Sequence, residues 1–162
     1  MRKQIYLAIC TALTEQVTDV KFIDLWNENI SALAGGAAWP APAVFVEFEP
    51  IQWRQHQLGN RRAEIAVRLH VITRAVAYNG SGDERQEQAL AYFDLIDQIN
   101  AAMQGLRGTN FAAFMLSASI SNHNHDELIE SVERFITSAQ DTTAVNQNIQ
   151  ATTLDNLNIT TS

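Results

Sequence analysis

Two histidines and an aspartate form the cluster in this sequence that is closest to a metal site. His123, His125 and Asp126 lie almost side by side, and imidazole and carboxylate groups are ligands that zinc and other transition ions accept. A further histidine or cysteine at a matching spacing does not accompany them. We therefore expect a polar hairpin turn here, with no bound metal and no cofactor.

Two pairs of carboxylates have spacings that would suit general acid–base chemistry. Glu47 and Glu49 fall on one side of a predicted strand, and Asp94 and Asp97 fall on a predicted helix. Such chemistry needs one carboxyl of a pair to be buried with a shifted pKa. Both pairs match the solvated side of an amphipathic element, so we expect no catalysis from them.

Motifs that bind phosphates or build a nucleophile do not occur in the sequence. Gly35 and Gly36 are followed by Ala-Ala-Trp-Pro and not by a helix start, so they do not form a phosphate-binding loop or a dinucleotide fingerprint. A nucleophile elbow is also missing. The sequence predicts that the protein is not an enzyme.

A basic and aromatic group lies between two predicted strands. It consists of Trp53, Arg54, His56, Arg61 and Arg62. One interpretation is a solvated loop whose arginines pair with nearby carboxylates. The other is a contact surface, because Trp and Arg are the residue types that most often dominate binding at protein interfaces.

The length, composition and charge of the chain limit the classes of protein to which it can belong. The chain has 162 residues, 46% of them hydrophobic, and a formal charge of -7, which fits one globular domain. Its Arg and Lys residues are scattered, so sequence-specific nucleic-acid binding is not expected. No apolar run approaches the ~20 residues of a membrane span. Cys10 is the single cysteine and lies in an apolar stretch, where we expect it to be packed and unreactive.

Hydrophobic periodicity predicts two helices and several strands. Helical spacing covers residues 2–17 and a second segment from about 86 to 106, which Asp83 could cap. Alternation predicts strands at 20–25, 44–48 and 63–73 and a final pair within 111–121 and 127–140. The order α-β-β-β-α-β-β and the single stripe on each helix predict an α+β fold. Its mixed, mainly antiparallel sheet would carry both helices on one face.

Two segments are expected to lie outside this compact part. Residues 51–62, with turn chemistry at Gly59-Asn60, would form the extended tip of a hairpin. Residues 141–162 are rich in Thr and Asn and hold no Lys or Arg, so we divide the chain into a domain at 1–140 and a C-terminal extension at 141–162. The extension would be either a passive flexible tail or an arm that a partner orders.

The succession of elements resembles a family of phage proteins. Pro42 precedes the strand PAVFVEFEP, AEIAVRLHVIT contains Arg68, Leu69 and Val71, the second helix contains ALAYFDLIDQINAAM, and ERFITS contains Arg134 and Phe135. This outline is similar to the tail terminator (tail completion, head-tail joining) proteins of long-tailed bacteriophages over residues 1–139. The likeness lies in element order and not in a signature motif, and the extension departs from it.

The resemblance implies a structural virion protein. Members of this family form a homo-oligomeric ring, a hexamer, that terminates the tail tube and joins it to head-tail connector proteins. The implied partners are the tail tube protein and the connector. The resemblance also implies that DNA passes through the ring and that the ring is assembled in the host cytoplasm. Two alternatives remain open: a head-side connector or other virion subunit of similar fold, and a small ligand-binding α+β domain.

Overall fold

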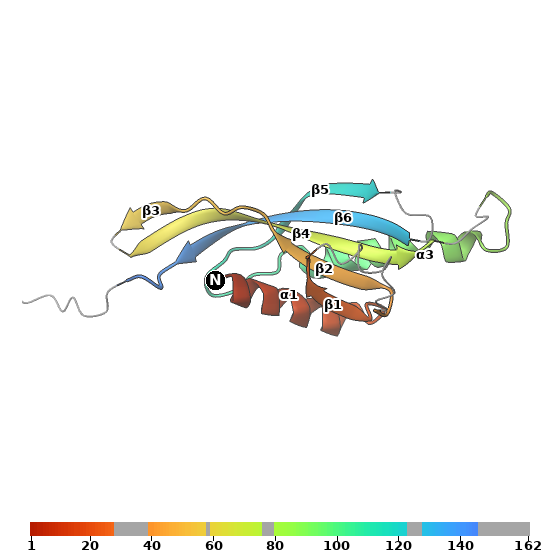
Figure 1. The fold of residues 1–162 in the computed structure, drawn as a ribbon, viewed down its shortest axis with the longest axis horizontal. Coiled ribbons are helices and arrows are strands. Elements are labelled where there is room, and N and C mark those ends of the chain that lie inside the picture. Colours follow the sequence, from red (N-terminus) through yellow and green to blue (C-terminus); the bar gives the residue numbers. More distant parts are fainter. Residues whose placement is uncertain (28–38, 58, 76–79, 123–127, 146–162) are drawn as a thin grey trace, which may run out of the picture.

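The structure, a computed structural model, describes residues 1–27, 39–57, 59–75, 80–122 and 128–145 (Figure 1). It contains two helices, α1 (Arg2–Gln16) and α3 (Gln86–Met103). The six strands are β1 (Phe22–Leu25), β2 (Ala43–Phe48), β3 (Arg54–Gln57), β4 (Asn60–Arg74), β5 (Met115–Asn122) and β6 (Leu128–Asp141). The α+β class and the predicted order are confirmed, with β3 as one additional strand.

One mixed sheet joins all six strands. Its order is β1-β2-β4-β6-β5, and β3 pairs with the beginning of β4. The β1–β2 pair is parallel and every other pair is antiparallel. The longest pairing runs from Arg61 opposite Asp141 to Arg74 opposite Leu128. Strand β4 is therefore the central strand of the sheet, and it is hydrogen-bonded to β2, β3 and β6.

Both helices cover the same face of the sheet, as the sequence predicts. Their apolar stripes meet the inward side chains of β2, β4 and β6 in one core cluster, which includes Ile5, Ile9, Leu13, Val46, Ile65, Val67, Leu69, Val71, Ile99, Met103 and Phe135. Alternate residues of a strand point to opposite faces. The alternating apolar residues of β4 thus form the surface on which α1 and α3 pack.

The opposite face of the sheet carries a small aromatic cluster at one end. Phe45 of β2 is fully buried there, and the rings of Phe22, Trp26 and Trp39 lie 5.9, 6.2 and 5.1 Å from it. Trp39 lies between Gly36 and Pro40 in the sequence, and its ring packs against that of Phe45.

Some boundaries differ from the predicted ones. The predicted strand at 111–121 begins only at Met115, because Phe111 and Phe114 leave the strand path and bury their rings in the core. Asp83 does not cap α3: its carboxylate accepts a hydrogen bond from the Arg85 N–H at 2.8 Å, and the helix begins at Gln86 without a side-chain cap. Cys10 is half-buried on α1, and burial raises the pKa of its thiol.

Candidate functional site

The predicted hairpin tip is the outer part of a three-stranded arm. Strand β2 pairs with β4 only from Val67 to Ile72, so residues 60–66 of β4 extend beyond it. There they pair with β3 on one side and with residues 136–141 of β6 on the other. We call β3 with these two segments the β-arm. At about 3.3 Å per residue, its β4 segment measures roughly 20 Å, and Figure 1 shows it reaching past the N-terminal end of α1.

The base of the β-arm is anchored in the core. Ala63, Ile65 and Ala139 belong to the main core cluster, and Phe111 packs beside them. Trp53, which precedes β3, also lies against this cluster and is only partly exposed. The arm is therefore a continuation of the folded sheet, and Trp53 is not at its outer end as the sequence suggested.

Arg61 connects the strands of the β-arm. Its Nη2 atom lies 2.8 Å from Oδ2 of Asp141, the residue directly opposite it on β6. The guanidinium carbon lies 4.9 Å from the centre of the Trp53 ring, a cation–π distance. The Thr143 N–H and the Arg61 guanidinium hold the pKa of Asp141 at about 2. The salt-bridge interpretation of the basic group is thus correct for Arg61.

Arg54 and Arg62 are placed differently from Arg61. They are direct cross-strand partners on β3 and β4, and both are exposed. Within the residues that the structure describes, neither guanidinium has a carboxylate within ion-pair distance. Like charges opposite each other destabilise a strand pair. His56 is also exposed on β3, so the structure places these three basic side chains on the arm.

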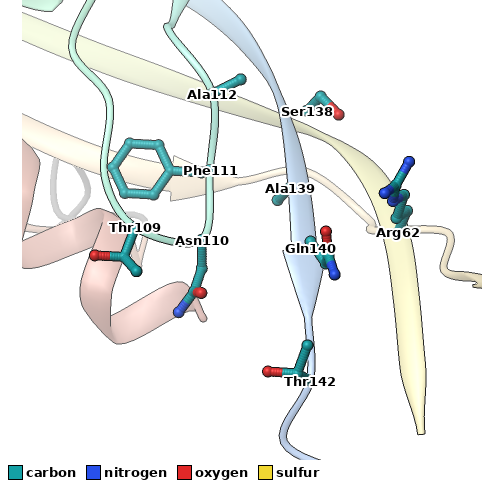
Figure 2. Close-up of a pocket in the computed structure, with 9 residues that line it drawn as sticks. All are labelled: Arg62, Thr109, Asn110, Phe111, Ala112, Ser138, Ala139, Gln140 and Thr142. Atoms are coloured by element: carbon teal, nitrogen blue, oxygen red, sulfur yellow. The ribbon is translucent and has the colours of Figure 1, made fainter.

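Two pockets flank the β-arm and share Arg62. The first, of about 450 Å³, lies between β6 and the loop that precedes β5, where Asn110, Ser138, Gln140 and Thr142 line it (Figure 2). Among its lining residues Arg62 is the one ionisable group. The second, of about 520 Å³, lies on the face opposite the helices and includes Arg54. Neither lining, among the described residues, contains a cysteine or histidine.

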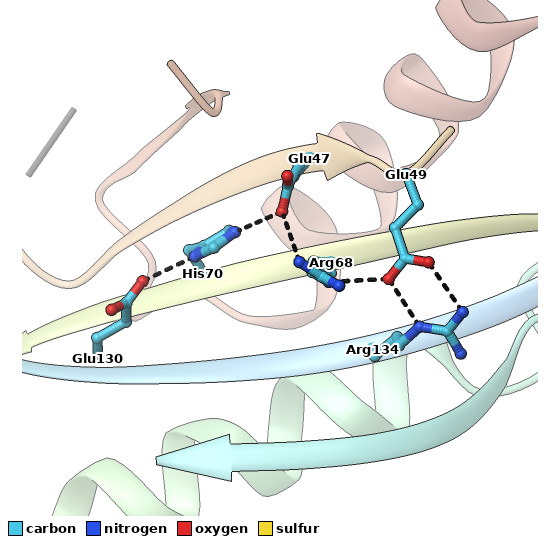
Figure 3. Close-up of polar contacts among 6 residues, drawn as sticks. All are labelled: Glu47, Glu49, Arg68, His70, Glu130 and Arg134. Carbon is cyan, nitrogen blue, oxygen red and sulfur yellow. Dashed lines mark hydrogen bonds and ion pairs between the residues drawn. The ribbon is translucent and has the colours of Figure 1, made fainter. Parts of the chain in front are cut away.

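A chain of hydrogen bonds and ion pairs crosses the sheet face opposite the helices (Figure 3). His70 lies between two carboxylates, with Nδ1 2.7 Å from Glu130 and Nε2 3.1 Å from Glu47, and its ring stacks on Trp26 at 3.8 Å. From Glu47 the chain continues to Arg68, Glu49 and Arg134. The alternation in β4 predicts that Arg68 and His70 share a face, but not which strands supply their partners.

The prediction that Glu47 and Glu49 are solvated is wrong. Their side chains are only 32% and 18% exposed. Glu49 accepts hydrogen bonds from Nε and Nη2 of Arg134 at 2.7 and 2.9 Å, and this contact lowers its pKa. A carboxyl with a lowered pKa remains ionised near neutral pH and is a poor general acid. Asp94 and Asp97 are exposed, as expected.

Two acidic residues with structural contacts were missed in the sequence. Glu133 is 1% exposed and faces α3, where it accepts hydrogen bonds from the Asn100 amide and the Ser119 hydroxyl. Glu133 lies two residues before the core residue Phe135, so both side chains point to the same face of the strand. This spacing is the signal that could have predicted its burial. Asp141 was assigned to the C-terminal extension, although it shares a strand phase with Ala139 and ends β6.

The histidine cluster lies outside the described residues, because 123–127 are not among them. In the part of the chain that is described, no group of three His, Cys, Asp or Glu side chains is placed so that it could hold a metal ion. Neither helix described here has the length and apolarity to cross a membrane.

The comparisons with known proteins give no match from which a functional site could be assigned to this chain. No protein-family model and no curated protein sequence matches the chain.

Proposed function

We propose that this protein is a non-enzymatic structural subunit that assembles into a ring, terminates a phage tail tube and joins the tail to the head. The observation that carries the proposal is the β-arm. It extends a well-packed domain into solvent and presents cations that find no partner within the described part of the chain. Contact with another subunit explains these cations, because two arginines that face each other across a strand pair do not stabilise an isolated domain.

The chemistry of the site also supports a structural role. The hydrogen bonds and ion pairs on the sheet face opposite the helices link carboxylates to arginines and to His70. The first pocket beside the arm is lined mainly by hydroxyl, amide and backbone groups, whereas half of the residues that line the second are charged. These surfaces suit protein contacts more than bond making. The proposed partners are further copies of the chain in a hexameric ring, the tail tube protein and the head-tail connector, with DNA passing through the ring in the virion.

Assembly in solution tests the proposal. Light scattering coupled to size exclusion, over a hundredfold range of concentration, should detect a closed oligomer, and negative-stain images should show rings. Purified tail tubes should bind these rings at one end. Rings that bind head connectors and not tubes would instead identify a head-side subunit. A chain that stays monomeric in the presence of both partners would exclude the proposal.

A further inference from the structure

The exposed side of α3 has an unusual composition for a helix surface. Leu90 and Phe93 are 41% and 48% exposed, and Glu87, Asp94 and Asp97 surround them in exposed positions. At 3.6 residues per turn these five residues fall on one side of the helix, opposite the core residues Ala89, Ile96 and Ile99. We call these five residues the α3 face.

The α3 face carries negative charge without internal compensation. The helix contains no Lys, Arg or His between residues 86 and 103. None of Glu87, Asp94 and Asp97 takes part in an ion pair within the described residues. Two neighbouring large apolar side chains inside an acidic rim are typical of a protein-binding surface.

The β-arm is complementary to this face in charge. Arg54 and Arg62 lie opposite each other on β3 and β4, exposed and unpaired among the described residues. We infer that the β-arm of one subunit docks on the α3 face of a second copy of the same chain, with Arg54 and Arg62 facing Asp94 and Asp97. This inference rests on the proposed ring function and names the contact that would close the ring.

The positions of the two surfaces suit a ring. In Figure 1 the β-arm lies at one end of the long axis, while the first turn of α3 lies toward the other end. Different surfaces at opposite ends produce a head-to-tail contact, which closes into a ring when the rotation between subunits is a simple fraction of a turn. Burial of Leu90 and Phe93 would supply most of the affinity, and the charges would set the register and speed the encounter.

Other exposed features fit less well. Strand β5 forms one edge of the sheet and exposes Met115 and Ile120, but it carries no charge that selects a partner. Duplex DNA could bind Arg54 and Arg62 through its phosphates, yet it would leave the acidic α3 face uncovered. A second copy of the chain accounts for both surfaces at once.

Reversal of charge on each surface tests the inference. The variants are Arg54→Glu with Arg62→Glu, Asp94→Lys with Asp97→Lys, and all four changes together. Each pair alone should raise the concentration for half-assembly at least tenfold, and the fourfold variant should recover most of this loss. The matched control for the arginine pair is Lys3→Glu with Arg107→Glu, which makes the same change of charge at exposed positions elsewhere and should assemble normally.

Replacement of the two apolar residues of the α3 face provides a further test, and unfolding of the variant shows whether it is still folded. Leu90→Ser with Phe93→Ser should weaken assembly, while the unfolding midpoint of the dissociated chain changes little, because each side chain is about half exposed. Rings that persist in both charge-reversed pairs, or a fourfold variant that stays dissociated, would overturn the contact and leave the ring function standing. Arginine variants that assemble normally but lose binding of a DNA duplex would overturn it in favour of nucleic acid. A wild-type chain that never assembles would refute the ring function itself.

Discussion

Arg61 and Asp141 face each other across β4 and β6, and their side chains meet at 2.8 Å although they lie far apart in the sequence. The carboxylate also accepts a hydrogen bond from the Thr143 N–H at 3.0 Å. These contacts fasten the last residues of β6 to the β-arm. The cationic surface on β3 and β4 therefore depends on a residue near the C-terminal end of the described chain.

The Arg61–Asp141 pair should make the β-arm less stable in acid. Contacts in the folded state lower the pKa of Asp141 from 3.8 to about 2. Its contribution is therefore complete above about pH 4 and is lost as the pH falls toward 2. Since Arg61 is 43% exposed, we expect Asp141→Asn to cost about 1 kcal/mol. Hydrogen exchange of the amides of residues 60–63 should speed up in this variant at pH 7, and equal rates in both proteins would contradict this prediction.

Gly59 at the turn of the β-arm should not tolerate a side chain. Its φ is +75°, and a Cβ there would lie 2.5 Å from the Cα of Val145. Left-handed backbone costs an L-residue about 1 to 2 kcal/mol, and the collision adds to that cost. Gly59→Ala should therefore loosen the arm tip and displace residues 144–145, which hydrogen exchange would report.

Two glycines in the 80–82 turn provide controls for this substitution. Gly82 has a φ of +86° but open space around its Cα, while Gly80 has open space and no positive φ. Gly82→Ala should show only the conformational cost, and Gly80→Ala should change stability by less than about 0.5 kcal/mol. Equal losses in Gly59→Ala and Gly82→Ala would show that residues 144–145 do not press on the turn.

The ion pairs of Glu49 should stabilise the sheet more than an isolated surface carboxylate does. Glu49→Gln leaves Arg134 and Arg68 without their shared partner, which we expect to cost about 1 to 2 kcal/mol at pH 7. The pKa of Glu49 is lowered in the folded chain, so this difference should disappear as the pH falls through that pKa. Urea unfolding measures both effects. Glu15→Gln, at an exposed site on α1, should be silent.

The fold could be predicted from the sequence wherever one side of an element is buried. The alternation in β4 and the stripes of α1 and α3 identify their buried faces, because burial imposes its period on the residues. Periodicity does not say which strands are neighbours, so the position of β6 beside β4 appears only in the structure. For the same reason, periodicity does not predict the partners of Glu49 or the pairing of Asp141 with Arg61. Both contacts join residues that lie far apart in the chain.

The candidate site was predictable in composition but not in arrangement. The sequence placed Trp53, Arg54, His56, Arg61 and Arg62 in one hairpin tip, and the structure confirms their proximity. It divides them, however, between partly exposed positions with partners and exposed positions. Arg61 faces the strand pair and Trp53, whereas its neighbour Arg62 faces solvent, since adjacent residues on a strand point to opposite faces. Only the exposed residues remain available for assembly.

The end of β6 determines how the C-terminal extension should be tested. Removal of everything after Gln140 would also delete Asp141, which pairs with Arg61, and residues 144–145, which lie against Gly59. A loss of assembly in that truncation would therefore report damage to the β-arm. Truncation after Val145 keeps these contacts and removes only residues 146–162.

The two truncations should behave differently. The chain that ends at Val145 should unfold at the same urea concentration as the full chain, whereas the chain that ends at Gln140 should lose protection of residues 60–63. If residues 146–162 serve as an arm that a partner orders, the Val145 truncation will lose ring formation or tail joining despite its intact β-arm. If they are passive, it will assemble and join tails like the full chain. Adding Asp141→Asn to the Val145 truncation should reproduce the faster exchange of the shorter chain, because it breaks the same contact between β4 and β6.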